Sequence, residues 1–130
     1  MAETGYRGYV GTRPLQGSRT PQHVQNIVIR DYARRNNLHY LLSGVEYVMP
    51  GCYMMLEDLL SDLSNTRGVI CYSLFMLPED ATHRRRIYNL LLGAKAELHA
   101  AVEDIAIRSE ADIAAVEDLF ALQNFITVME

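Results

Sequence analysis

Side chains that could bind an anion gather after the first expected strand. The loop that follows residues 6–12 contains Arg13 and Arg19, and Thr20-Pro21 then opens a helix. Threonine can cap freed backbone N–H groups, and proline fits the first helical turn. The start of a helix also offers unpaired N–H groups and the positive end of its dipole, which predicts a site for a phosphate or carboxylate group. Neither a P-loop nor a GxGxxG pattern is present, and the alternative interpretation is that the loop glycines serve turns while the arginines are solvated.

The first turns of this helix are unusually rich in amide and imidazole groups. Such groups lower helix propensity and gain little on a plain surface. Two interpretations stay open: the groups hydrogen-bond a polyhydroxyl or nucleotide ligand, or Gln25 and Asn26 fasten the neighbouring loop. His23 could act as a general acid or base because its charge changes near neutral pH, or it is a surface residue. The residues concerned are Gln22, His23, Gln25 and Asn26.

Further candidates follow the next expected strands, because ligands of open parallel sheets bind beyond the carboxyl ends of the strands. Glu46 and Tyr47 are an acid–phenol pair that is either catalytic or structural. We predict catalytic roles for His23, Glu46 and Tyr47, and ligand-binding roles for Arg13, Arg19, Gln22, Gln25, Asn26, Ser43 and Ser73.

The elements that must position these residues alternate between strand and helix. Gly68–Phe75 is nearly all apolar, which is typical of a strand buried on both faces. Gly44–Gly51 is expected to be a loop, with Pro50 opening the next helix. His99 and Glu103 have the same parity in a fourth expected strand, where filling the core explains them best. The other expected elements are strands at 6–12 and 38–43, helices starting near residues 21, 50 and 78–80, and a final helix from a capping box at Ser109 and Asp112 to about Asn124.

The order βαβαβαβα predicts a single α/β domain over residues 1–130. We expect a three-layer sandwich with a mostly parallel central sheet of four or five strands. Met54 and Met55 are expected to fill the core, and the run Arg84–Arg86 is expected to be a solvated helix turn.

Composition narrows the class of protein. The chain has 130 residues, of which 49% are hydrophobic and 22% charged, as in ordinary globular domains. Its apolar runs are too short to span a membrane, and the N-terminal residues do not resemble a signal peptide. Cys52 and Cys71 have no metal-ligand spacing, so a reducing compartment fits. We therefore expect a cytoplasmic protein without a metal, a cofactor or a membrane partner.

Charge is distributed unevenly. Residues 6–35 contain six arginines and one aspartate, whereas residues 79–130 contain ten acidic and five basic residues. The basic part fits a small anionic ligand, but it is too small for the broad basic face that nucleic acids require.

One resemblance covers residues 5–103. The chain resembles the small sporadic carbohydrate cluster proteins at Gly5-Tyr6-Arg7-Gly8-Tyr9, Arg13-Pro14, the stretch TPQHVQN at 20–26, Ile29–Tyr32, Leu42-Ser43, Glu46-Tyr47 and Cys52-Tyr53. The resemblance implies a bacterial protein encoded among genes for surface-polysaccharide or lipopolysaccharide sugars. It does not supply a reaction.

The order of elements is also similar to the catalytic domain of serine recombinases, the resolvases and invertases. This similarity implies a resolvase-like or flavodoxin-like fold. The nucleophilic serine of that family falls near Gly11 here, and the segment Leu74–Glu79 has no arginine. Phosphoryl transfer on DNA needs both features, so the similarity extends to the fold alone.

Three functions follow as expectations. The first is binding, and possible modification, of a sugar nucleotide or sugar phosphate, with catalysis itself left open. The second is a non-catalytic interaction subunit of a carbohydrate-biosynthesis enzyme, because the apolar tail Leu119–Met129 could bury against a partner or a second copy in a homo-oligomer. A resolvase-like DNA-binding domain without recombinase activity is the remote third.

Overall fold

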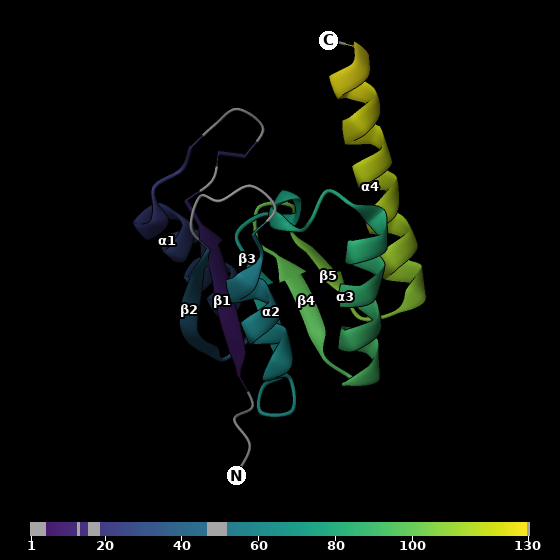
Figure 1. The fold of residues 1–130 in the computed structure, drawn as a ribbon. Helices are drawn as coiled ribbons and strands as arrows, with labels where there is room; N and C mark the ends of the chain where they lie inside the picture. The colour runs from purple at the N-terminus through teal and green to yellow at the C-terminus, as the bar shows by residue number, and fades with distance from the viewer. Residues whose placement is uncertain (1–4, 13, 16–18, 47–51, 130) are drawn as a thin grey trace.

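A central sheet of five strands organises the chain (Figure 1). The structure is a computed structural model and describes residues 5–12, 14–15, 19–46 and 52–129. The strands are β1 (Tyr6–Gly11), β2 (Tyr40–Glu46), β3 (Gly68–Cys71), β4 (Glu97–Ala100) and β5 (Ile105–Ile107). The helices are α1 (Gln22–Arg35), α2 (Met54–Ser61), α3 (Ala81–Gly93) and α4 (Glu110–Met129), with a short 3-10 helix at Leu74–Met76.

The strand order is β2-β1-β3-β4-β5. β1 pairs in parallel with β2 and β3, β3 pairs in parallel with β4, and β5 runs antiparallel to β4. This arrangement confirms the predicted α/β fold with a mostly parallel sheet. Because β2 and β3 lie on opposite sides of β1, the carboxyl end of β1 is the point where this topology places a ligand crevice.

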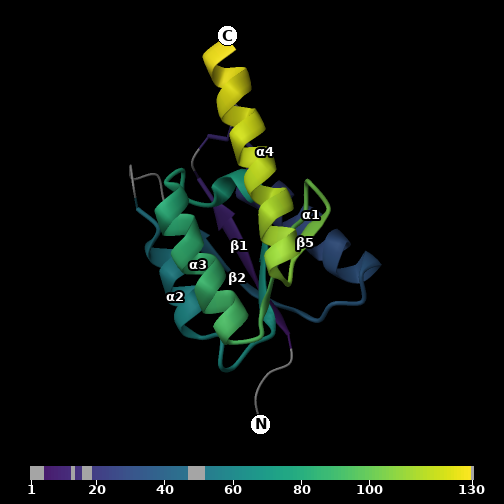
Figure 2. The same ribbon diagram turned by 90° about the vertical axis from the view of Figure 1, so that its right-hand side faces the viewer.

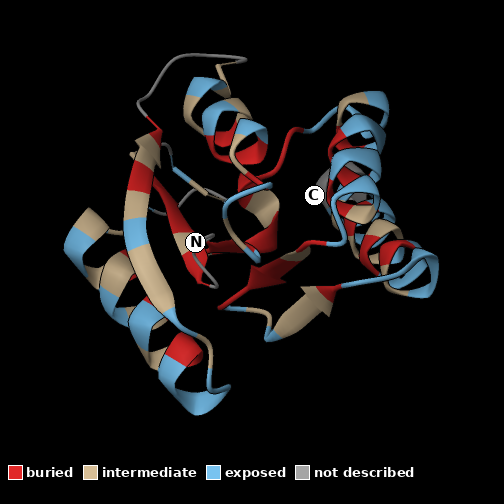
Figure 3. Ribbon diagram, turned by 90° about the horizontal axis from the view of Figure 1, so that it is seen from below, coloured by how far each residue is buried: buried red, intermediate tan, exposed pale blue. Residues whose placement is uncertain are grey.

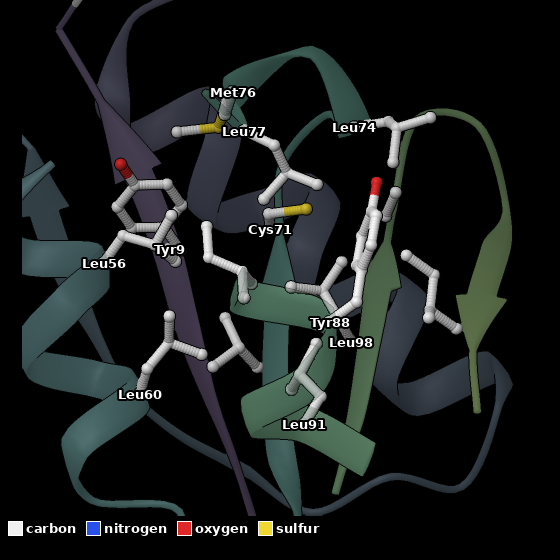
Figure 4. Close-up of a cluster of buried hydrophobic side chains, with 14 of the residues drawn as sticks. Tyr9, Leu56, Leu60, Cys71, Leu74, Met76, Leu77, Tyr88, Leu91 and Leu98 are labelled. Carbon is white, nitrogen blue, oxygen red and sulfur yellow. The ribbon is translucent and has the colours of Figure 1, made fainter. Parts of the chain in front are cut away.

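Helices cover both faces of the sheet (Figure 3). On one face, α1 packs through Ile29, Tyr32 and Ala33 against β1 side chains. On the other face, α2, α3 and α4 enclose a larger core, part of which appears in Figure 4. That core includes Tyr9, Leu56, Leu60, Cys71, Leu74, Met76, Leu77, Tyr88, Leu91 and Leu98.

The end of α1 lies where the sequence predicts it. The helix ends at Arg35, and Asn37 adopts a left-handed conformation with φ 57°. Asparagine tolerates this conformation better than most residues. Arg34 and Arg35 occupy the last turn, where a positive charge is favoured by the helix dipole.

β2 extends three residues beyond its predicted end, so the predicted loop is wrong over Gly44–Glu46. β2 pairs with β1 as far as Gly11 and Glu46. A Cβ atom at Gly44 would collide with the side chain of Met55 on α2. The glycine therefore permits close packing of a helix on the strand rather than a turn. Residues 47–51, with the predicted helix start at Pro50, lie outside the described residues.

β2 also contains one residue more than β1 over the same length. Tyr6 pairs with Tyr40, whereas Gly8 pairs with Ser43. The extra residue makes a bulge in this edge strand. Arg7 Nε donates a hydrogen bond of 2.6 Å to the carbonyl of Leu42, which gives the bulged backbone a partner.

Two other apolar segments are shorter strands than predicted. β3 ends at Cys71 and not at Phe75, because Ser73 Oγ accepts a hydrogen bond from the Phe75 N–H and starts the 3-10 helix. β4 ends at Ala100, whereas the expected fourth strand continues to Glu103. A turn with Asp104 at φ 57° then leads into β5, which the sequence pattern does not predict. Apolar runs fit buried irregular segments as well as strands, which explains both errors.

α4 is longer than predicted and continues to Met129. Its start has the predicted cap: Ser109 Oγ accepts from the Asp112 N–H, while the Asp112 carboxylate accepts from the Arg108 N–H. Figure 2 shows the second half of α4 extending beyond the sheet. Across the described part of the chain, no helix is long and apolar enough to cross a membrane.

The sequence predicts a solvated turn at Arg84–Arg86, and this prediction is wrong for Arg84, whose side chain is 5% exposed. Its guanidinium donates to Glu117 and to the carbonyls of Pro78 and Glu79. It also lies 3.9 Å from the ring centre of Phe120. A buried charge is tolerated here because its donors are satisfied. Met54, predicted to fill the core, is instead 75% exposed.

Candidate functional site

A pocket of about 260 Å³ lies where β1 ends and the chain enters α1. Two of the residues predicted to bind a ligand, Arg19 and Gln22, line it. Arg13 lies outside the described residues. The full lining is Gly11, Thr12, Arg19, Thr20, Pro21 and Gln22.

The start of α1 forms one wall of this pocket. Pro21 stands at the N-cap position, and within the described chain no side chain caps the helix there. The first turn also contains no acidic residue. A helix start leaves backbone N–H groups unpaired and carries the positive end of the dipole. With the exposed cation of Arg19 beside it, this wall favours an anionic group.

Gln25 holds the backbone of two residues that line the pocket, Gly11 and Thr20. The side chain is buried at 2% exposure, and its Oε1 accepts from the Gly11 N–H at 3.0 Å. Its Nε2 donates to the carbonyls of Gly11 and Thr20 at 2.7 and 2.8 Å. Both ends of the amide are therefore occupied by the backbone that borders the pocket, which is the loop-fastening interpretation of this residue.

Asn26 and Ser43 lie together between α1 and β2, and neither lines the pocket. Ser43 Oγ donates to Asn26 Oδ1 at 2.7 Å and lies 2.6 Å from the Tyr40 hydroxyl. The guanidinium of Arg30 stands 5.4 Å from the centre of the Tyr40 ring. This group fastens α1 to the edge strand.

Glu46 is buried on the opposite face, beside α2. Its carboxylate accepts from the Tyr9 hydroxyl at 2.9 Å and from the N–H groups of Met55 and Leu56 at 3.1 and 3.3 Å. It therefore serves as a distant cap for α2, whose own N-cap residue supplies no side-chain bond. The predicted partner Tyr47 lies outside the described residues, and the phenol that contacts Glu46 is that of Tyr9.

Ser73 and His23 also lie apart from the pocket lining. Ser73 is buried, and its hydroxyl donates to Glu103 at 2.8 Å. Glu103 also accepts from the Leu74 N–H at 2.8 Å, so it holds the turn after β3. His23 is exposed on the first turn of α1.

On the face of the sheet covered by α1, His99 belongs to a network of hydrogen-bonded side chains. The sequence predicts only that His99 fills the core. His99 Nε2 donates to Glu97 at 2.8 Å, and Nδ1 accepts from the Tyr32 hydroxyl at 2.6 Å. Glu97 also accepts from Tyr6 and pairs with Arg108 at 3.1 Å. Burial lowers the pKa of His99, despite the opposing effect of Glu97. Burial and the bond to Glu97 raise the pKa of Tyr6 to about 12.

The lining of the pocket defines what it can do. It gathers a guanidinium, two hydroxyls, an amide and the start of a helix, but its described lining includes no carboxylate or imidazole. These groups can bind and orient an anion with neighbouring hydroxyls. Sequence reasoning finds Arg19 and Gln22 but misses Thr12, whose only indication was its place directly after β1.

Comparison with known proteins supports the fold. The chain is similar to the crystal structure of the N-terminal catalytic domain of TP901-1 integrase, with a TM-score of 0.63. The likeness covers 95% of this chain and 98% of that domain at 16% sequence identity. At this identity the likeness concerns the resolvase-like fold and not the activity. No protein-family model and no curated protein matches the sequence.

Proposed function

We propose that this chain binds a small anionic ligand of the sugar phosphate or sugar nucleotide class in the pocket between β1 and α1. One observation carries the proposal: the uncapped, acid-free start of α1 and the cation of Arg19 border the same concave pocket. The phosphate would lie against the helix start, because both the N–H groups and the dipole favour negative charge there.

The sugar part of the proposal rests on the sequence. The stretch PQHVQN resembles the sporadic carbohydrate cluster proteins, and its Gln22 lies in the pocket wall beside Thr20. Amide and hydroxyl groups are suited to the hydroxyls of a sugar. The cellular role that follows is cytoplasmic, in the biosynthesis of a bacterial surface polysaccharide.

Binding is a better description of this pocket than catalysis. Glu46 is occupied by Tyr9 and the start of α2, and Ser73 is occupied by Glu103. The predicted catalytic role of Glu46 and the predicted ligand-binding role of Ser73 would each require those bonds to break. His23, exposed on the first turn of α1, is the candidate nearest in sequence to the pocket wall.

A thermal-shift titration tests the proposal. The probes are inorganic phosphate, a hexose 1-phosphate and a uridine diphosphate sugar. A ligand at a hundredfold excess over its Kd should stabilise the fold by about 2.7 kcal/mol. Arg19→Ala should weaken a binding probe about tenfold or more, since a hydrogen bond from a charged group contributes about 1.5–3 kcal/mol.

Arg34→Ala is the matched control, because Arg34 is an exposed arginine in the last turn of α1, at the end of the helix away from the pocket. It should leave the affinity unchanged. Equal losses in both variants would indicate a general charge effect, and no response to any probe would remove the support for a ligand of this class.

A further inference from the structure

A second pocket, of about 350 Å³, lies between the segment after β1 and the helix α4. Leu15, Phe75 and Phe120 contribute apolar surface to it, and Gln123 and Asn124 contribute amide groups. Figure 1 shows α4 extending beyond the carboxyl ends of the parallel strands, which is the part of the helix that borders this pocket. The pocket therefore lies at the same edge of the sheet as the pocket at the start of α1.

The aromatic side of the second pocket is held in place by its surroundings. Phe75 belongs to the 3-10 helix after β3, and the hydrogen bond between Ser73 and Glu103 fastens the start of that helix. The rings of Phe75 and Phe120 meet edge-on, with their centres 5.2 Å apart. The guanidinium of Arg84 lies 3.9 Å from the centre of the Phe120 ring. A preformed aromatic pocket suits a flat, rigid ring, because binding then requires little rearrangement.

We propose that this second pocket holds the base of a nucleotide whose phosphates lie at the start of α1. The ligand of the chain is then a sugar nucleotide and not a sugar phosphate. This inference rests on the function proposed above and names the ligand class within it.

The size of the first pocket supports a second one for the same ligand. The pocket at the start of α1 has a volume of about 260 Å³. Pockets that enclose a whole small molecule usually measure roughly 300–1,000 Å³. The first pocket therefore has room for the phosphates, whereas the remainder of a nucleotide needs a neighbouring space.

The two pockets flank the same short segment of the chain. Thr12 lines the first pocket, and Pro14 and Leu15 line the second. Because Thr12 and Pro14 are two positions apart in the sequence, their Cα atoms are at most about 7 Å apart. A ribose can bridge a gap of this size between a phosphate and a base.

Charge assigns a different part of the ligand to each pocket. Arg19 and the uncapped start of α1 favour the phosphates in the first pocket. In the second pocket, the charged group of the described lining is the carboxylate of Glu79, which would repel a phosphate. That carboxylate can accept from the N–H groups of a base, and the exposed amide of Asn124 can both donate and accept. The second pocket therefore suits an uncharged ring with a polar edge.

Isothermal titration calorimetry with probes that have or lack a base tests the proposal. The probes are pyrophosphate, uridine 5′-diphosphate and guanosine 5′-diphosphate. At least one of the nucleotides should bind the wild-type chain about tenfold more tightly than pyrophosphate, because the base gains contacts with aromatic rings. Phe75→Leu keeps an apolar side chain but removes a ring. It should abolish most of this preference and leave the affinity for pyrophosphate unchanged.

A second pair of variants tests the polar edge of the pocket. Asn124→Ala should weaken nucleotide binding about threefold or more, since it removes a hydrogen-bonding group. Asn124 is exposed, so this variant should fold even if the loss of the Phe75 ring is not tolerated. Asn89→Ala is the matched control, because Asn89 is an exposed asparagine of α3 that belongs to neither described lining. It should leave the affinity for every probe unchanged.

The outcomes separate this inference from the function on which it rests. Arg19→Ala should weaken pyrophosphate and nucleotides alike, because both carry the phosphates. Equal affinities for all three probes, or a nucleotide affinity that neither Phe75→Leu nor Asn124→Ala lowers, would overturn the base pocket and leave the anion site standing. A wild-type chain that binds none of the probes would overturn both proposals.

Discussion

Arg84 of α3 and Glu117 of α4 form a two-pronged ion pair, with the arginine Nε and Nη2 donating to the two carboxylate oxygens at 2.8 and 2.7 Å. The same guanidinium holds the carbonyls of Pro78 and Glu79. The bond from Arg84 helps to lower the pKa of Glu117. One buried side chain therefore joins two helices and the segment that precedes α3.

Arg84→Met should destabilise the fold strongly. The substitution fills the space, but it takes the guanidinium away from Glu117, which keeps the Tyr88 hydroxyl, and from the carbonyls of Pro78 and Glu79. Removing one partner of a buried pair costs about 3 kcal/mol of unfolding free energy, measurable by urea denaturation. Arg85→Ala is the control: Arg85 makes an exposed pair with Glu110 and should have little effect. Similar losses in both variants would contradict the special role of Arg84.

Gln25→Ala should loosen the backbone around the proposed pocket. It removes the partners of the Gly11 N–H and of the carbonyls of Gly11 and Thr20. Buried groups left unpaired in this way cost about 1–3 kcal/mol. Amide hydrogen exchange should accelerate at Gly11, whereas Gln22→Ala, at the half-buried start of the helix, should leave it unchanged. Protection of the Gly11 amide in the Gln25 variant would refute this assignment.

Stability should depend on pH through His99. Because burial lowers its pKa below the ordinary value of 6.5, the folded chain binds this proton less readily than the unfolded chain. The unfolding free energy should therefore be highest above pH 6.5 and fall as the pH drops below it. His99→Gln should flatten the profile between about pH 7 and 5, as measured by chemical denaturation. A wild-type profile without slope in that range would show that His99 is not the controlling group.

Two glycines should respond to alanine with opposite signs. Gly68 has φ 156°, and a Cβ atom there would collide with the Glu97 carbonyl of β4. Gly68→Ala should lower the unfolding free energy by about 3 kcal/mol. Gly93, at the end of α3, has open space around the added atom, so Gly93→Ala should raise stability by about 0.5–1 kcal/mol. Thermal melts of both variants measure the difference, and equal signs would disprove it.

The sequence predicts the fold well because its main elements carry independent local indications. The capping residues of α4, the asparagines after α1 and the apolar run of β3 each indicate one element. It predicts strand ends poorly. Gly44, for example, is a residue typical of turns, but here it lies in a strand and lets Met55 pack closely against it. That contact joins β2 to α2 and exists only in the folded chain.

The sequence predicts where the candidate site lies, but it does not predict which of the candidate side chains line it. The rule for parallel sheets locates the pocket at the end of β1, and Arg19 and Gln22 line it. Glu46 satisfies the same rule but faces α2, because successive residues of a strand point to opposite faces. The burial of Arg84 could not be read from a run of three arginines, since its partner Glu117 is 33 residues away.

The two edge strands of the sheet, β2 and β5, affect how readily the chain aggregates at high concentration. β2 is bulged where Arg7 holds the Leu42 carbonyl, and β5 is only three residues long. Bulged and short edge strands are poor templates for the strands of another molecule. The sheet should therefore resist edge-to-edge aggregation even in concentrated solution.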